Sequence, residues 1–246
     1  MKYDSNKTNI DTKISMYLDT PKNKDPDAFS KTLIRYHFLL WNKGVLNNNI
    51  KVNDNSRPYY LNLVIDHNMY KLTSDSIINS YKSWNSVQNI IKEIDEDGVD
   101  SFFRLASTIG GYIIFPGYRV NNKPTINAAR GINKHIKDRF DLTLECIKLW
   151  YEKIDNPLYQ SIDIYKDYFN IFKSFKNFIV FFHLEDLVDE ALEVKHFLPF
   201  KTFSEPYEVV PSNKDSYIEY MENAKKFINS RNHRIQKYAN EMVSSK

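Results

Sequence analysis

The sequence has a single cysteine and no long apolar run, and each of these shortages excludes a class of protein. The single cysteine, Cys146, rules out an internal disulfide, as is typical of a protein from a reducing cytoplasm. The longest apolar run, residues 178–182, is far too short to cross a membrane. The N-terminal stretch MKYDSNKTNIDTKIS has no apolar core of a signal peptide. We therefore expect a cytoplasmic protein without a membrane segment.

An excess of charge of one sign is also missing. The net charge is only +3 over 246 residues, which does not indicate a dedicated nucleic-acid binder with a strongly basic face. A local basic groove is compatible with this balance, so nucleic acid stays among the candidate partners. The sequence has no CxxC, HExxH or Ser-His-Asp pattern, and no motif that identifies a metal site or a cofactor. The cofactor, the oligomeric state and the reaction therefore stay open.

Hydrophobic periodicity predicts an α+β fold, with a small, mostly antiparallel sheet in the N-terminal half packed against a helical C-terminal half. Two β-prone runs, residues 59–65 and 69–73, flank a short polar turn and predict a hairpin. YIIFP, residues 112–116, predicts a buried strand. Apolar residues at helical spacing predict helices around residues 32–43, 87–94, 138–151, 158–172 and 221–242.

The chain is expected to form one domain, 1–246. Turn signals in residues 1–30 indicate a partly extended arm. Pro199, Pro206 and Pro211 make residues 199–211 an extended connection to the C-terminal helix.

The polar tripeptide Ser74–Ser76 allows two interpretations. Serine and aspartate accept hydrogen bonds from the free N–H groups of a helix start, so the tripeptide could cap a helix over the residues that follow. It could also be the polar end of a strand that faces a pocket. Local chemistry favours the helix cap.

One window, Arg104 to Glu145, gathers residues that the rest of the chain uses sparingly. It holds four of the six glycines and four arginines: Gly110, Gly111, Gly117, Gly131, Arg104, Arg119, Arg130 and Arg139. Glycine permits close backbone approach, and the planar fork of arginine grips a carboxylate or a phosphate. The window therefore predicts a site.

Within this window, TINAARG (125–131) lies between a proline and a helix start, where free N–H groups favour an anion. The prediction is a pocket for a small anionic ligand, a phosphate-bearing molecule or nucleotide. The ligand-binding residues would be Arg104, Asn127, Arg130 and Arg139. The alternative is a structural loop in which Arg130 pairs with Asp138 or Asp141.

Asp141 and Glu145 lie four residues apart on one helical face, so they could share a proton and act as acid or base. The alternative is a solvated acidic face paired with Lys148. Arg130 and His135 also match the R-x4-H spacing of a superfamily of helical ribonucleases, in which the arginine would hold the phosphate and the histidine would move the proton. The strand-rich first half fits that all-helical fold poorly.

Six segments resemble an uncharacterised bacterial family, a domain of unknown function: residues 25–43, 73–77, 110–116, 125–131, 137–147 and 197–200. The likeness covers most of the chain and is densest in the glycine- and arginine-rich window. It implies a self-standing bacterial protein, and it implies no activity, cofactor or partner.

Three functions follow from these patterns. The first is an enzyme or effector with a pocket lined by Arg, Asn and Asp for a phosphate-bearing small molecule or nucleotide. The second is a non-catalytic interaction or regulatory protein, in which the Arg/Asp set is a structural ion-pair network. The third is an RNA-cutting effector that uses Arg130 and His135.

Overall fold

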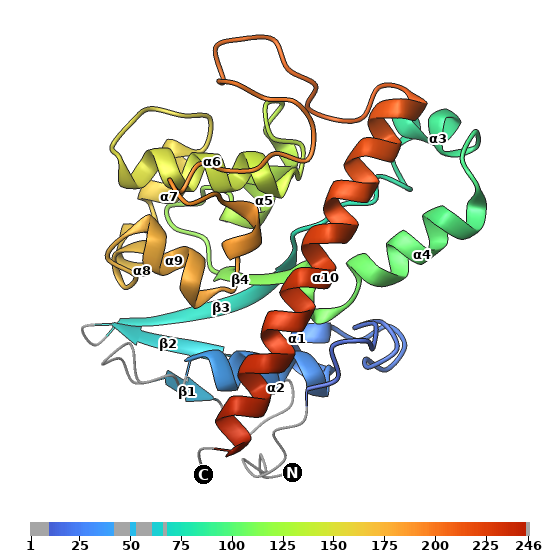
Figure 1. Ribbon diagram of the computed structural model, residues 1–246. Coiled ribbons are helices and arrows are strands. Elements are labelled where there is room, and N and C mark those ends of the chain that lie inside the picture. The colour runs from blue at the N-terminus through green and yellow to red at the C-terminus, as the bar shows by residue number, and fades with distance from the viewer. Residues whose placement is uncertain (1–9, 42–49, 53–60, 66–67, 245–246) are drawn as a thin grey trace.

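The fold is α+β, as the sequence predicts, with an antiparallel sheet in the first half and helices in the second (Figure 1). The computed structural model describes residues 10–41, 50–52, 61–65 and 68–244. In this part of the chain the strands are β1 (Ile50–Val52), β2 (Leu61–Ile65), β3 (Asn68–Ser76) and β4 (Tyr112–Pro116). They pair antiparallel in the order β1-β2-β3-β4. The expected hairpin is β2–β3, and the expected buried strand is β4.

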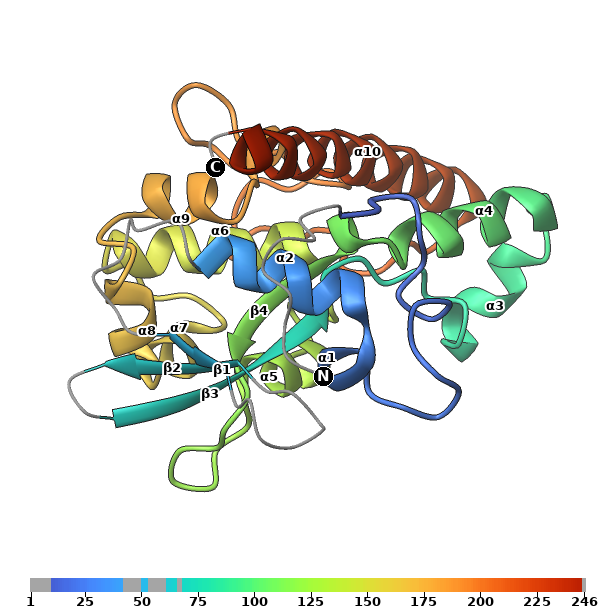
Figure 2. The same cartoon turned by 90° about the horizontal axis from the view of Figure 1, so that it is seen from below.

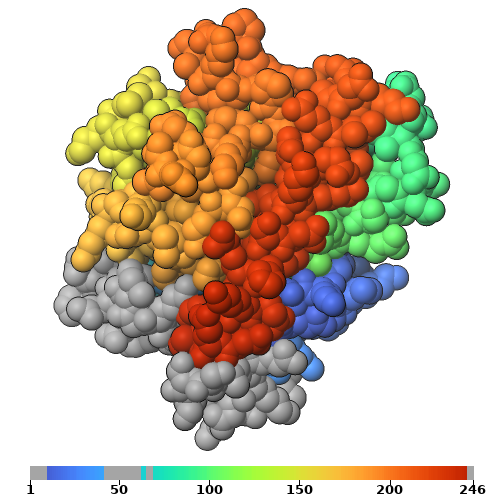
Figure 3. Space-filling model, viewed as in Figure 1, coloured from blue at the N-terminus to red at the C-terminus, as the bar shows by residue number. Residues whose placement is uncertain are grey.

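Helices make up most of the remainder of the described chain. They are α1 (Pro26–Phe29), α2 (Lys31–Trp41), α3 (Asn85–Ile91), α4 (Glu96–Ala106), α5 (Ile126–Ile132), α6 (Phe140–Tyr151), α7 (Tyr159–Asp163), α8 (Lys166–Asn170), α9 (Phe175–Phe181) and α10 (Lys214–Ser244), with 3₁₀ turns η1 (Ile109–Gly111) and η2 (Glu185–Leu187). Helix α2 lies between the sheet and α10 (Figure 2). Helix α10 then crosses the outer face of the molecule (Figure 3).

The core joins β4 to the second-half helices. Seven apolar residues of β4 and of the second half have 2% exposure or less: Ile113, Ile114, Phe115, Leu144, Ile147, Phe169 and Phe172. Although β4 ends the strand order, every residue along it is buried, because helices pack against it. Tyr168 on α8 donates from its hydroxyl to the carbonyl of Ile114 at 2.6 Å.

The pair Gly110–Gly111 docks the C-terminal helix. A Cβ atom on Gly111 would lie 1.9 Å from the carbonyl oxygen of Ala106, so the backbone there needs glycine. The carbonyls of Gly110 and Tyr112 accept from the buried guanidinium of Arg231 on α10 at 2.8 and 2.6 Å. These glycines therefore serve a close backbone approach and form no phosphate loop.

Two segments differ from what their local sequence predicts. Ser74–Ser76 is the end of β3, paired with Ile114, Ile113 and Tyr112 on β4, so the predicted helix cap is wrong. Residues 77–84 form no helix. Conversely, TINAARG is itself helical: Thr125 caps α5 by accepting from the N–H of Ala128 at 3.3 Å. Pairing across the sheet outweighs the capping tendency of serine and aspartate, because each ladder residue satisfies its backbone groups.

The two segments that the sequence predicts to be extended, residues 1–30 and 199–211, differ in structure. Residues 199–211 contain no helix or strand, in line with the expected extended connection. In the expected arm, residues 10–25 form turns, and Ile10 and Met16 are buried in the core. The first nine residues of that arm lie outside the described part.

Candidate functional site

Arg130 is the buried centre of the predicted window. Its side chain is fully buried at the last turn of α5. Its Nε donates to the Thr143 hydroxyl at 2.9 Å, and one terminal nitrogen donates to the Asp138 carbonyl at 3.1 Å. The other terminal nitrogen donates to the carboxylate of Asp75 on β3. The partner carboxylate is thus Asp75, and neither Asp138 nor Asp141 takes that role.

The Asp75 carboxylate faces a pocket at the end of β3, which we call the β3 pocket. Its volume is about 460 Å³, within the range of small-molecule sites. The lining comes from five separate stretches of the chain: Tyr17, Asp75, Ser76, Ile78, Asn79, Ser80, Lys82, Ser83, Phe103, Ala106, Ser107, Tyr112 and Asp138. Hydroxyl, amide and carboxyl groups therefore dominate its polar wall.

Charge in the β3 pocket is mainly acidic. Burial raises the pKa of Asp75, and the nearby Asp138 acts in the same direction, while the guanidinium of Arg130 opposes them. The side chain of Asp75 keeps 23% of its surface exposed. Lys82 is the only lysine or arginine among the described residues of the lining, and its ammonium already pairs with Asp100 at 2.5 Å. The pocket thus offers carboxyl groups and little free positive charge.

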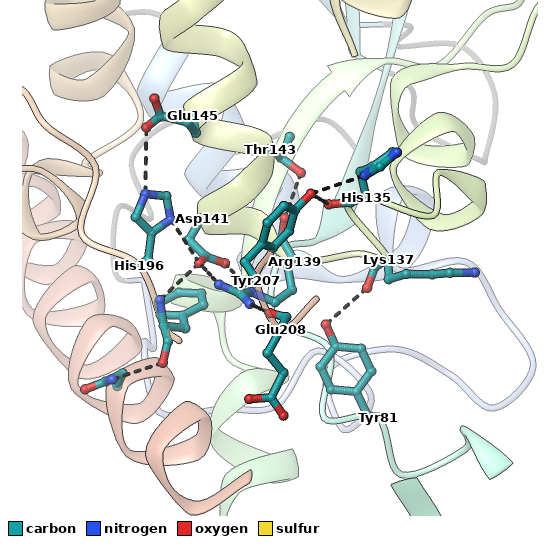
Figure 4. Close-up of polar contacts among 12 residues, drawn as sticks. Tyr81, His135, Lys137, Arg139, Asp141, Thr143, Glu145, His196, Tyr207 and Glu208 are labelled. Atoms are coloured by element: carbon teal, nitrogen blue, oxygen red, sulfur yellow. Dashed lines mark hydrogen bonds and ion pairs between the residues drawn. The ribbon is translucent and has the colours of Figure 1, made fainter. Parts of the chain in front are cut away.

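Strained backbone lies beside the pocket. Tyr81, Lys137 and Asp138 have φ angles of 55°, 47° and 63°, in the left-handed region that side chains other than glycine rarely adopt. The hydroxyl of Tyr81 donates to the Lys137 carbonyl at 3.1 Å, which ties two of them together (Figure 4). Such backbone is costly and clusters at functional sites. Here it sets the position of the Asp138 carboxyl group in the pocket wall.

An aromatic pair forms the apolar wall of the β3 pocket. The rings of Tyr17 and Phe103 stack with centroids 5.8 Å apart and an interplanar angle of 16°. Both rings reach solvent, with exposures of 58% and 39%. The backbone N–H of Met16 donates to the Ser107 carbonyl at 2.8 Å and fixes this wall against α4.

A second cluster, around Arg139 and Asp141, is closed (Figure 4). Both side chains are fully buried, and the guanidinium donates to both carboxylate oxygens. The N–H of Phe197 also donates to Asp141, at 3.0 Å. Burial alone would raise the pKa of Asp141, but Arg139 and the hydrogen bonds hold it well below its usual range. An aspartate buried and paired in this way is a structural anion.

Glu145 belongs to the rim of this closed cluster. The ring of His196 lies between the two acids, with Nδ1 3.4 Å from the Asp141 carboxylate and Nε2 3.8 Å from that of Glu145. Lys148 lies 3.9 Å from Glu145, which is the expected pairing, but the face is not solvated: the side chain of Asp141 is fully buried and that of Glu145 is 12% exposed. Burial raises the pKa of Glu145, although Lys148 opposes the shift. Neither Asp141 nor Glu145 lines the β3 pocket.

The remaining expected site residues lie apart. Arg104 is on α4 and lines another pocket, described below. The amide oxygen of Asn127 is buried and has no hydrogen-bond partner within the described part of the chain. The carbonyl of His135 accepts from the Tyr207 hydroxyl at 3.0 Å. Because Arg130 is buried and engaged with three partners, it presents no fork to an RNA phosphate alongside His135.

The described residues show neither a metal site nor a membrane span. These residues contain no group of three His, Cys, Asp or Glu side chains that could hold a metal ion. None of the helices described here is long and apolar enough to cross a bilayer.

Sequence reasoning missed Asp75 as a site residue. The signal was present in the alternative that Ser74–Ser76 ends a strand facing a pocket, since β3 does end there. The sequence presents Asp138 as a possible partner of Arg130, and nothing in the sequence indicates that Asp138 lines a pocket.

Comparison with known proteins gives a family and no activity. No curated protein and no solved structure matches the chain. A family of unknown function, DUF6994, matches residues 10–235, which include the β3 pocket and the Arg139–Asp141 cluster. The chain belongs to this family of unknown function, DUF6994.

Proposed function

We propose that the chain binds a neutral, hydroxyl-bearing small molecule in the β3 pocket and uses Asp75 and Asp138 for proton transfer. One observation carries the proposal: a fully buried arginine holds the carboxylate of Asp75 from behind while that carboxylate faces a pocket. Arg130 is itself fixed by Thr143 and by the Asp138 carbonyl, so the acid is held rigidly. Catalytic acids need this kind of pre-organisation.

The ligand class follows from the lining. Ser76, Asn79, Ser80 and their neighbours supply donors and acceptors, and the two carboxylates accept from hydroxyl groups. The stacked pair of Tyr17 and Phe103 supplies an apolar face against which a sugar-like ring can pack. An anionic ligand would meet two carboxylates with only Lys82 to balance them, so the phosphate group expected from the sequence does not suit this pocket.

Both acids suit the transfer of a proton. Burial raises the pKa of Asp75 and the guanidinium of Arg130 opposes that shift, and as the partner of Arg130 Asp75 is a carboxylate that can accept a proton from a ligand hydroxyl group. Asp138 lies in the same wall and suits the base that accepts one. A ligand hydroxyl group between them would give its proton to one of the two carboxylates, and that carboxyl group would then return the proton to the ligand.

The alternative proposal is a non-catalytic regulatory protein that binds the same class of ligand without changing it. The closed Arg139–Asp141 pair favours it, because the arginine and aspartate residues of that cluster are structural. The two proposals share a ligand and differ in whether product forms.

Saturation-transfer nuclear magnetic resonance with a panel of neutral monosaccharides and nucleosides tests the ligand class. We expect a neutral compound to receive saturation from wild-type protein and to lose most of it with Phe103→Ala, because the ring wall is gone. The control is Ile154→Ala, a change at an exposed side chain that does not line the β3 pocket. A panel without any binder, or equal signals from both variants, would contradict the proposal.

A further inference from the structure

A second pocket lies on the other side of the segment that carries Tyr17. Its volume is about 590 Å³, and we call it the basic pocket. The backbone contact between Met16 and Ser107 runs between the two pockets, since Tyr17 and Ser107 line one, while Ser15 and Thr108 line the other. The N-terminal segment (blue), the end of α4 (green) and α10 (red) adjoin on the face shown in Figure 3.

The charge of the basic pocket is opposite to that of the β3 pocket. Among the residues that the structure describes, Lys13, Arg104 and His233 line it, and no aspartate or glutamate does. All three side chains belong to exposed residues. The nearest acid along α4, Asp100, is slightly affected by Arg104 but forms its direct ion pair with Lys82 at 2.5 Å. Within the described part of the chain, Arg104 and Lys13 form no ion pair, so their charge is available to a ligand.

Helix α10 gives this pocket a rigid polar wall. Asn229, Asn232, His233 and Gln236 recur at offsets of three, four and seven residues, which places them on one helical face. The amide of Asn232 is fixed: it accepts from the Gly110 N–H at 2.8 Å and donates to the Thr108 hydroxyl at 2.8 Å. The wall is therefore set by the docking of α10 on the glycine pair.

We propose that the basic pocket binds the phosphate group of a small molecule. The fork of Arg104 can take two phosphate oxygens, Lys13 adds a point charge, and the amides of Asn229 and Gln236 can donate to the remaining oxygens. This site differs from the β3 pocket in ligand class and shares no lining residue with it. Of the residues expected from the sequence to bind an anion, Arg104 alone belongs to it.

Isothermal titration calorimetry at low ionic strength tests this site with four probes: inorganic phosphate, pyrophosphate, AMP and adenosine. Screening weakens exposed ion pairs, so a low salt concentration gives the largest signal. We expect binding of at least one phosphate-bearing probe at the basic pocket. Adenosine is a neutral nucleoside and a candidate ligand of the β3 pocket, so any binding of adenosine should be the same for wild type and Arg104→Gln. Binding of AMP in preference to inorganic phosphate identifies a phosphate ester as the ligand class, and the reverse preference identifies the free anion.

The variant Arg104→Gln keeps a polar side chain, shorter than that of arginine, and removes the positive charge and the fork. Binding of the phosphate probe should weaken by about tenfold or more, because a charge-assisted bidentate contact is lost. The matched control is Arg119→Gln, a change at an exposed arginine outside the pocket. Both variants alter exposed side chains, and equal melting temperatures will show that both are folded.

Three outcomes overturn the proposal. The first is that none of the phosphate-bearing probes binds the wild-type protein. The second is that Arg104→Gln weakens the binding of adenosine as much as that of AMP, since the basic pocket would then recognise the nucleoside. The third is that Arg104→Gln weakens binding no more than Arg119→Gln does, since the anion would then be held by general positive charge.

Discussion

Arg130 and Asp75 lie 55 residues apart in the chain, yet the guanidinium of one donates to the carboxylate of the other. The contact joins α5 to the end of β3 and leaves the arginine fully buried. A buried charge is tolerated only when it is paired and hydrogen-bonded. The pair therefore fixes the position of an acid in the β3 pocket and also helps to hold the two halves of the fold together.

Arg130→Lys should lower stability. Lysine keeps the charge but cannot reach Thr143, Asp75 and the Asp138 carbonyl at once. We expect a loss of about 2–4 kcal/mol in the free energy of unfolding, measured by denaturant titration. Arg119→Lys, at an exposed site, is the control and should change it by less than about 0.5 kcal/mol. Equal midpoints for the two variants would show that the buried network contributes nothing to folding.

His37 should make the protein sensitive to acid. Burial, assisted by the charge of Arg231, lowers its pKa from 6.5 to about 3. Because the folded pKa lies below the unfolded one, this contribution to stability is fully present above about pH 6.5 and is lost as the pH falls toward 3. At pH 4.5 the loss from this group amounts to about 2–3 kcal/mol.

His37→Phe removes the titrating ring at a position whose two ring nitrogens have no hydrogen-bond partner among the described residues. The variant should lose less stability than wild type between pH 7 and pH 4.5. Asp27, whose pKa is raised to about 6 chiefly by burial, titrates with the opposite sign in the same range, and the comparison between variants cancels it. Parallel pH profiles of urea unfolding for the two proteins would refute the assignment.

Leu144→Ala should leave a cavity in the core. Leu144 is fully buried on α6, and truncation of such a side chain costs about 2–5 kcal/mol. Ile132→Ala is the comparison, because that side chain is 69% exposed and its loss should cost less than about 1 kcal/mol. A Leu144→Ala midpoint close to that of wild type would mean that the facing of α6 is wrong.

Cys146 should react slowly with thiol reagents in the native protein. The thiol is fully buried in α6, and burial raises its pKa well above the usual value. Labelling with a maleimide should accelerate strongly when denaturant is added. Rapid labelling in the absence of denaturant would contradict the burial and would make Cys146 a candidate nucleophile.

The elements with strong local patterns were predictable from the sequence. YIIFP forms the buried strand β4, and the apolar spacing near the C-terminus belongs to α10. Arg139 and Asp141 are two residues apart, and their pairing is a local event at the start of α6. A structural Arg/Asp ion pair was therefore one of the alternatives that the sequence offered. The buried contact between Arg139 and Asp141 agrees with that alternative.

The β3 pocket was not predictable in the same way. Tyr17, Asp75, Phe103 and Asp138 meet only because β3 pairs with β4 and the N-terminal segment packs on α4. Local chemistry favoured a helix cap at Asp75, and the sheet register places it opposite Ile113 instead. Arg104 and Arg130 both belong to the arginine-rich window of the sequence. In the fold, Arg104 lines the basic pocket at the surface and Arg130 is fully buried.

Asp138→Asn is the variant that separates function from folding. Asn tolerates the left-handed backbone that residue 138 adopts, so the fold should be retained. Asp75→Asn is less informative, because it leaves the buried Arg130 without its carboxylate. Glu219→Gln, at an exposed residue of α10 away from the pocket, is the matched control.

The most direct test of the central claim is a calorimetric titration of the best neutral ligand from the panel into wild type, Asp138→Asn and Glu219→Gln. The β3 pocket account predicts that Asp138→Asn binds about tenfold or more weakly, because a carboxylate that accepts from ligand hydroxyls is lost. It predicts that Glu219→Gln binds like wild type, and that all three proteins melt within a few degrees of one another. Equal affinity of Asp138→Asn and wild type for that ligand would contradict the account.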